Sequence, residues 1–173
     1  PAVGISYEDG SYLVRLTERS DEATVKIKTT DTNYDVETFN VICDVEPDDP
    51  VDDEYVVVGS HYDGHDISQG AMDPASGAVT VMEIARTLNK VKKSLKRRVR
   101  CICFGAEEIG LFGSYNYVAV HKDEMDKARF MLNLDSGGSP GKKGVTFRDF
   151  PELEPLLKQW ADEMNAEMPT DQR

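Results

Sequence analysis

The sequence is short of basic residues, of cysteine, and of long apolar runs. It has 20 Lys and Arg against 32 Asp and Glu, and the formal net charge of −12 would repel the phosphate backbone of a nucleic acid. No apolar run approaches the ~20 residues that a membrane-spanning helix needs. The three cysteines are an odd number and indicate no disulfide framework. We therefore expect neither nucleic acid nor membrane as a partner of this chain.

No targeting segment can be read at the start of the chain, so the sequence leaves the cellular compartment open. A length of 173 residues is sufficient for one domain with a sizeable core. We expect the three cysteines, Cys43, Cys101 and Cys103, to lie buried in strands.

Short apolar runs bounded by turn residues divide the chain into strands and helices. The predicted strands cover residues 4–7, 24–28, 39–45, 54–59, 99–104, 130–134 and 145–147, and the predicted helices cover about 73–88, 114–121 and 151–166. The early strands are expected to be mostly antiparallel, and the continuous apolar run at 54–59 predicts a central strand buried on both faces. Strands that alternate with helices predict an α/β fold, a three-layer α/β/α arrangement with a mixed central sheet.

Chemically active side chains directly follow each of the later strands. His61 and Asp63 follow the first buried strand, Glu107 and Glu108 the second, and Asp135 the third, while Asp73 precedes the first long helix. Ligands of open α/β sheets gather at the carboxyl ends of the strands, so we expect these groups to converge. Crowded carboxylates repel one another unless they share protons or bind a metal. Because His, Asp and Glu are ligands that zinc accepts, a metal site is the preferred interpretation, with a solvated acidic loop as the alternative for any single residue.

Four motifs occur in a fixed order along the chain. They are His61-Tyr62-Asp63, Gly70-Ala71-Met72-Asp73-Pro74-Ala75-Ser76-Gly77, Glu107-Glu108-Ile109-Gly110-Leu111-Phe112-Gly113-Ser114 and Leu132-Asn133-Leu134-Asp135. Together they resemble the motifs of the di-zinc aminopeptidase and glutamate carboxypeptidase family. The loop at residues 68–73 is similar to that of the plasma glutamate carboxypeptidase branch, and residues 1–6 resemble the exit from an upstream protease-associated domain. The resemblance implies that residues 1–173 are part of a peptidase catalytic domain of the zinc-exopeptidase type, truncated at its C-terminus.

The resemblance also implies a role for each site residue. It implies that His61, Asp73 and Glu108 hold one zinc ion. Asp73 would bridge to a second zinc ion that Asp135 also binds. Glu107 would be the general base, and the carboxylate of Asp63 would orient the ring of His61 through its other nitrogen, although a plain turn residue is an alternative for Asp63. A cis peptide bond between Asp73 and Pro74 is implied as well.

One feature of the family pattern has no counterpart in this chain. The second zinc ion of the family takes a further histidine near the end of the catalytic domain, and the histidines here are His61, His65 and His121. His65 lies in a loop near the site, where a solvated loop histidine and a replacement ligand are both open interpretations. His121 follows a helix and is expected at the surface. We therefore expect the chain alone to hold at most one zinc ion well.

The predicted activity is that of a zinc-dependent exopeptidase, an aminopeptidase or dipeptidase that hydrolyses a peptide or dipeptide with a metal-activated water. A non-catalytic binding domain of the same fold and a glutaminyl-cyclase-like acyltransferase are the alternatives. Apolar residues of the last helix near Leu153, Leu156 and Trp160 are expected to be uncovered and to favour self-association.

Overall fold

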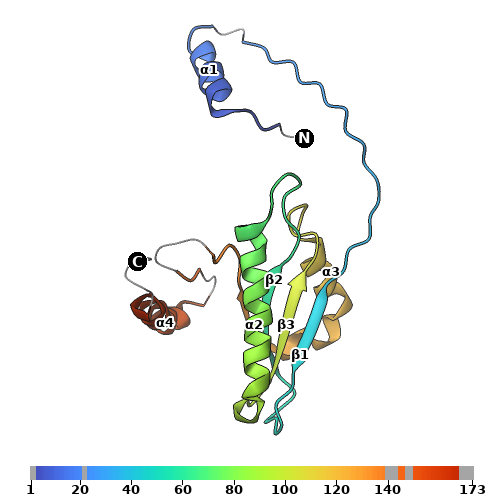
Figure 1. The fold of residues 1–173 in the computed structure, drawn as a ribbon, viewed down its shortest axis with the longest axis vertical. Coiled ribbons are helices and arrows are strands. Elements are labelled where there is room, and N and C mark those ends of the chain that lie inside the picture. Colours follow the sequence, from blue (N-terminus) through green and yellow to red (C-terminus); the bar gives the residue numbers. More distant parts are fainter. Residues whose placement is uncertain (1–2, 21–22, 139–143, 147–149, 168–173) are drawn as a thin grey trace. The chain divides into compact units, whose positions relative to one another are not determined.

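The computed structural model describes residues 3–20, 23–138, 144–146 and 150–167. It consists of two compact units, Pro1–Val36 and Glu37–Arg173, and all the predicted site residues belong to the second. The elements are drawn in Figure 1. In chain order they are α1 (Tyr7–Thr17), β1 (Val41–Val45), β2 (Tyr55–His61), the π-helical turn η1 (Ala71–Ser76), α2 (Gly77–Lys90), the 3₁₀ turn η2 (Lys92–Ser94), β3 (Arg98–Phe104), α3 (Phe112–Val120), the 3₁₀ turn η3 (Lys122–Lys127), β4 (Ala128–Asn133), the 3₁₀ turn η4 (Pro151–Leu153) and α4 (Glu154–Glu167).

The first unit differs from the sequence-based prediction of strands. Residue 7 begins helix α1, in which the hydroxyl of Ser6 accepts a hydrogen bond from the backbone N–H of Asp9 and two acidic residues occupy the first turn. Both features stabilise a helix N-terminus, and they outweigh the short apolar run at residues 4–7. The predicted strand at 24–28 is also wrong, because residues 24–28 have no partner strand and the side chains of Val25 and Ile27 are exposed.

The second unit contains the sheet, whose strand order is β1-β3-β2-β4. Strand β2 pairs in parallel with β3 on one side and with β4 on the other, and β1 pairs with β3 in antiparallel orientation. The predicted mixed sheet and the central position of the strand near residues 54–59 are therefore confirmed. The carboxyl ends of β2, β3 and β4 point to the same edge.

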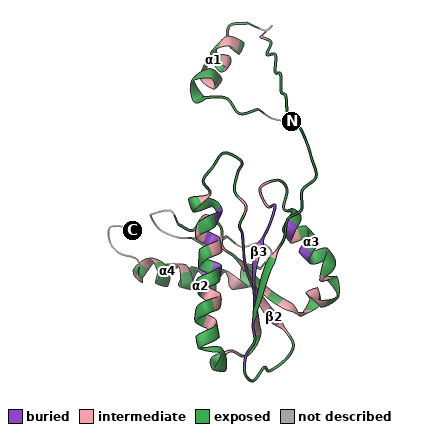
Figure 2. Cartoon of the chain, turned by 45° about the vertical axis from the view of Figure 1, so that its right-hand side comes forward, coloured by how far each residue is buried: buried purple, intermediate pink, exposed green. Residues whose placement is uncertain are grey.

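Helices pack on both faces of this sheet, as the three-layer prediction requires. On one face Val81 of α2 packs with Val58 and Cys101. On the other face Tyr117 of α3 packs with Tyr55, Val57, Ile102 and Phe104, which form the larger cluster of buried side chains. Figure 2 shows these buried stretches on the strands and on parts of α2 and α3, whose outer surfaces are exposed. The alternation of side chains along β2 and β3 produces the two separate clusters.

The N-terminus of α2 lies against the carboxyl ends of two strands because Gly77 has no side chain. A Cβ atom at this position would clash with the carbonyl oxygen of Leu134 and with the hydroxyl of Ser60. Only glycine permits this close approach of helix to sheet. The contact brings the turn η1, which carries Asp73, to the edge where the strands end.

The remaining sequence-based predictions have mixed outcomes. Cys101 is buried and Cys103 is half-buried, but Cys43 is exposed, because it lies on the edge strand β1. Residues 145 and 146 form no strand, and residue 147 of that predicted strand lies outside the described residues.

No helix in the described part of the chain is long and apolar enough to cross a membrane. Leu156 and Trp160 of α4 are 41% and 45% exposed, and self-association through them stays a prediction.

A buried guanidinium group on β3 binds two carboxylates and a tyrosine hydroxyl. Arg100 of β3 donates two hydrogen bonds of 2.8 Å to the carboxylate of Asp44, one of 2.7 Å to Glu124 and one of 3.1 Å to the hydroxyl of Tyr117. The hydrogen bonds from Arg100 lower the pKa values of Asp44 and Glu124. The network is thus electrically compensated, as a buried charge requires.

We predict that Asp44→Asn lowers the free energy of unfolding at pH 7 by about 1.5–3 kcal/mol, the range for a hydrogen bond to a charged group. The lowered folded-state pKa of Asp44 means that its contribution is present above the unfolded pKa and is lost as pH falls through the folded pKa. Urea unfolding at pH 7 and at pH 3 would measure both effects, and the difference between wild type and variant should shrink at pH 3. Asp53→Asn is the control, because that carboxylate is 75% exposed beside Lys127 and should contribute little. Equal stability of Asp44→Asn and wild type at pH 7 would contradict the prediction.

Candidate functional site

Three parallel strands and one helical turn bring the predicted site residues together. His61 is the last residue of β2, Glu107 and Glu108 lie in the loop after β3, and Asp135 follows β4. Because β2 lies between β3 and β4, His61 stands between the other two strand ends. Asp73 comes from η1, directly before α2. The expected convergence at one edge of the sheet is therefore present.

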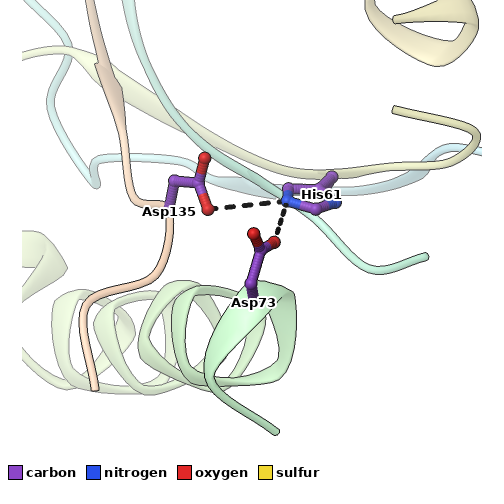
Figure 3. A group of neighbouring side chains, drawn as sticks. All are labelled: His61, Asp73 and Asp135. Carbon is purple, nitrogen blue, oxygen red and sulfur yellow. Dashed lines mark ion pairs between the residues drawn. The ribbon is translucent and has the colours of Figure 1, made fainter. Parts of the chain in front are cut away.

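The imidazole ring of His61 is the centre of this group. It is 4% exposed, and its Nε2 atom lies 3.0 Å from Oδ1 of Asp73 and 3.6 Å from Oδ1 of Asp135. Figure 3 shows the two carboxylates approaching this nitrogen from different elements, Asp73 from the helical turn and Asp135 from the segment after β4. The three ligand atoms lie within 4.8 Å of one another.

The hydrogen bond of His61 to Asp63 makes the space between these three atoms favourable for a cation. Its Nδ1 lies 2.9 Å from the backbone carbonyl oxygen of Asp63, which can only accept, so Nδ1 carries the hydrogen. In the neutral ring, Nε2 then has no hydrogen, and its lone pair faces two carboxylate oxygens. This arrangement is repulsive unless a proton or a metal ion lies between Nε2 and these oxygens. Ligand atoms of a tetrahedral zinc site with bonds of about 2.0–2.2 Å lie roughly 3.3–3.5 Å apart, a spacing that the two observed distances bracket. The nitrogen and oxygen donors therefore fit a divalent metal such as zinc.

The neighbouring negative charges also shift the pKa of His61. Burial by itself lowers the pKa of His61, but the hydrogen bond to Asp63 and the negative charges of Glu107, Asp135 and Asp73 together raise it above its ordinary value. The surroundings thus favour positive charge at this ring. A bound metal ion would supply that charge in place of the proton.

Asp63 orients both the histidine and the two glutamates, in a way that the sequence did not predict. We expected its carboxylate to hold the His61 ring, but the backbone carbonyl of Asp63 makes that hydrogen bond, and the carboxylate oxygen lies 3.7 Å away. The carboxylate instead accepts hydrogen bonds from the backbone N–H groups of Glu107 (2.9 Å) and Glu108 (3.1 Å). Asp63 therefore fastens the loop after β3 to the end of β2.

The two glutamates face different pockets, as expected for adjacent residues at a strand end. Oε2 of Glu107 lies 3.9 Å from Nδ1 of His61, and Glu107 lines a pocket with His61 and Asp135. Glu108 lines a second pocket with Asp73 and His65, and its Oε2 lies 3.2 Å from Nε2 of His65. Glu107 is therefore placed beside the histidine centre, and Glu108 is placed apart from it.

The ligand atoms that lie together differ from the expected division of the ligands, and that division stays a prediction. We expected Glu108 to join His61 and Asp73, with Asp135 on a second ion. In the described residues the set of three that could hold a metal is His61, Asp73 and Asp135. Strand β4 is the direct neighbour of β2 and brings Asp135 to Nε2 of His61. Glu108 instead lines the pocket that His65 and Asp73 also line.

The backbone around the site has several rare conformations. The described non-glycine residues with positive φ are Ala106, Leu111 and Ser136, at 54°, 60° and 34°. Ala106 directly precedes Glu107, and Ser136 directly follows Asp135. In both places the backbone therefore changes direction next to a candidate site residue. Such residues concentrate at functional sites. The Asp73–Pro74 peptide bond is cis, as predicted.

The pocket beside Glu107 contains residues that sequence reasoning did not select. Besides His61, Glu107 and Asp135, its lining residues are Phe104, Leu111, Ser114, Met131 and Asn133. Three of these are apolar and two are polar. The sequence could have indicated two of them, because Phe104 and Asn133 are the last residues of β3 and β4, and ligands gather at strand ends. Leu111 and Ser114 reach the pocket only through the fold of the loop and helix after β3.

Comparison with known proteins finds relatives that are named as peptidases. The chain is 37% identical over 144 residues to "Aminopeptidase YwaD" of Bacillus subtilis (strain 168), a match that covers 83% of this chain and 30% of that protein. It is 29% identical over 138 residues to "Carboxypeptidase Q" of Rattus norvegicus, covering 79% of this chain and 29% of that protein. A solved zinc aminopeptidase from Bacillus subtilis has 35% identity and a TM-score of 0.53 over 61% of this chain and 26% of its own.

The chain thus spans about 30% of the length of these curated relatives. Residues 40–172 match the profile of peptidase family M28. The resemblance read from the four sequence motifs is confirmed, and the chain belongs to peptidase family M28.

Proposed function

We propose that this chain supplies the metal-binding part of a zinc-dependent exopeptidase, an aminopeptidase or dipeptidase that hydrolyses peptides or dipeptides. The observation that carries the proposal is the buried Nε2 of His61, which faces Asp73 and Asp135 with Glu107 beside the ring. Membership of a peptidase family and the likeness to a zinc aminopeptidase support it. We further propose that residues 1–173 are part of one peptidase catalytic domain.

Each side chain of the site has a separate task in this proposal. His61, Asp73 and Asp135 would hold a zinc ion, which when bound lowers the pKa of a coordinated water to about 7 and polarises a peptide carbonyl. The carboxylate of Glu107, 33% exposed beside the ring, accepts the proton of the attacking water and delivers it to the leaving amine nitrogen. Asp63 holds the His61 ring by its carbonyl and the Glu107 loop by its carboxylate, so one residue fixes the base relative to the metal ligands.

We predict that Glu107→Gln, in an intact enzyme that contains this chain, retains bound zinc but loses at least ~100-fold in turnover of a dipeptide substrate. Glutamine keeps the size of the side chain and cannot accept the proton. Metal content by elemental analysis and initial hydrolysis rates would be measured together, with the exposed Glu152→Gln as the matched control. A near-normal rate in Glu107→Gln would rule out Glu107 as the base, and a wild type that binds zinc without cleaving peptides would favour the non-catalytic binding domain. A wild type that instead cyclises an N-terminal glutaminyl peptide would favour the acyltransferase.

We also predict that Asp135→Ala weakens zinc binding by at least ~10-fold, since even residues that merely support a ligand cost 10- to 100-fold. Competition with a chromogenic chelator would measure the dissociation constant. Asp66→Ala is the control, because Asp66 is an exposed carboxylate of the loop after β2 and has the same change in charge. If both variants bound zinc equally well, the grouping of Asp135 with His61 and Asp73 would be wrong.

A further inference from the structure

We propose that Asn40 is a positioning residue for Glu107, because its side-chain amide holds the base of the loop in which Glu107 lies. This inference rests on the proposed function, in which Glu107 accepts the proton of the attacking water. Asn40 directly precedes the edge strand β1, far from Glu107 in the sequence, and the sequence analysis did not select it. It acts on Glu107 through the backbone of the loop after β3.

The loop that carries Glu107 is closed by hydrogen bonds of its own backbone. At its base, the N–H of Gly113 donates to the carbonyl oxygen of Gly105 over 2.9 Å. Inside the loop, the N–H of Leu111 donates to the carbonyl oxygen of Glu107 over 2.8 Å. The place of the Glu107 backbone therefore depends on how the two ends of this closed loop are held.

The side-chain amide of Asn40 binds both ends of the loop. Its Nδ2 donates to the carbonyl oxygen of Gly113 over 2.8 Å, and its Oδ1 accepts from the N–H of Gly105 over 3.2 Å. Both glycines are buried, where backbone polar groups need hydrogen-bond partners. An asparagine amide offers a donor and an acceptor in one planar group, as a peptide unit does. Asn40 thus joins the two ends across the base of the loop.

The close approach of residues 38–40 to the loop depends on the same two glycines. A Cβ atom at Gly113 would clash with Oδ1 of Asn40 and with the carbonyl oxygen of Gly105. A Cβ atom at Gly105 would clash with the hydroxyl of Thr38. Only glycine leaves room for these contacts. The segment before β1 is therefore packed tightly against the loop base and is more than a connection to the strand.

Tyr62 ties this segment to the end of β2. Its hydroxyl donates to the backbone carbonyl oxygen of Phe39 over 2.7 Å, and Tyr62 directly follows the proposed metal ligand His61. Residues 38–40 therefore connect the strand end that carries His61 with the loop that carries Glu107.

Asn40 and Asp63 hold the Glu107 loop at different points. The carboxylate of Asp63 accepts from the N–H of Glu107 itself, whereas Asn40 holds the two ends of the loop. A general base must lie at a defined distance from the water that it deprotonates, and a misplacement of about 1 Å can cost ~100-fold in rate. The second point of attachment is the contribution that we assign to Asn40.

Asn40→Ala tests the proposal in an intact enzyme that contains this chain. We expect kcat for a dipeptide to fall at least ~10-fold, with KM and the dissociation constant of zinc unchanged. Hydrogen–deuterium exchange followed by mass spectrometry should become faster in residues 105–113 and stay unchanged in β2, because the loss is local. Asn116→Ala is the matched control, since Asn116 is an exposed asparagine of α3 and should change none of these quantities.

A double-mutant cycle tests whether Asn40 and Tyr62 act through the same segment. Tyr62→Phe removes the hydrogen bond to Phe39 and should also lower kcat, and the loss in the double variant should be smaller than the product of the two single losses. Losses that multiply fully would contradict the shared segment.

Other outcomes separate this inference from the proposed function. An unchanged kcat in Asn40→Ala, or a loss of kcat with an equal loss of zinc affinity and faster exchange throughout β2, would overturn the positioning role while the proposed function stands. A wild type that binds no zinc and cleaves no peptide would contradict the proposed function itself.

Discussion

Uncompensated negative charge at one edge of the sheet is the constraint on which the site depends. Three parallel strands end side by side, and their following residues place Glu107, Glu108 and Asp135 around His61, with Asp73 added by the neighbouring turn. Carboxylates held this close raise one another's energy unless a cation lies among them. The fold supplies strands and a buried imidazole, and the ion pairs recorded there among the described residues are made with histidine rather than with lysine or arginine.

The same sheet shows the other solution to this problem. Midway along β3, Arg100 satisfies Asp44, Glu124 and Tyr117 with its own hydrogen bonds, and these carboxyl groups are stabilised in their charged forms. That cluster is complete without any ligand and contributes to stability. The proposed function assigns the cluster at the strand ends an added ion, and this contrast would distinguish a functional centre from a structural one.

Asp63 links the fold to the chemistry. Its carbonyl selects the tautomer of His61, and its carboxylate accepts hydrogen bonds from the backbone of both glutamates, so the end of β2 is joined to the loop after β3. The left-handed residues Ala106 and Ser136 lie beside Glu107 and Asp135, where the chain turns off the strands. In the proposed function, the left-handed residues and a single aspartate would preorganise the ligands for the metal ion.

The sequence by itself predicted the fold class, most of the elements of the second unit and the convergence of the candidate site residues at one edge of the sheet. Continuous apolar runs, turn residues and polar groups at strand ends are local signals, and they predicted β2, β3, β4 and the convergence of His61 with its carboxylates. The sequence analysis missed helix α1 because the short apolar run at its start favours a strand, whereas the hydroxyl of Ser6 caps a helix there. The predicted strand at 24–28 was wrong because a strand needs a partner strand, and a local pattern does not show whether one is present. Only the tertiary structure decided which carboxylate accompanies which histidine. That pairing depends on the adjacency of β4 to β2 and on the hydrogen bonds of Asp63, which are contacts between residues far apart in the sequence.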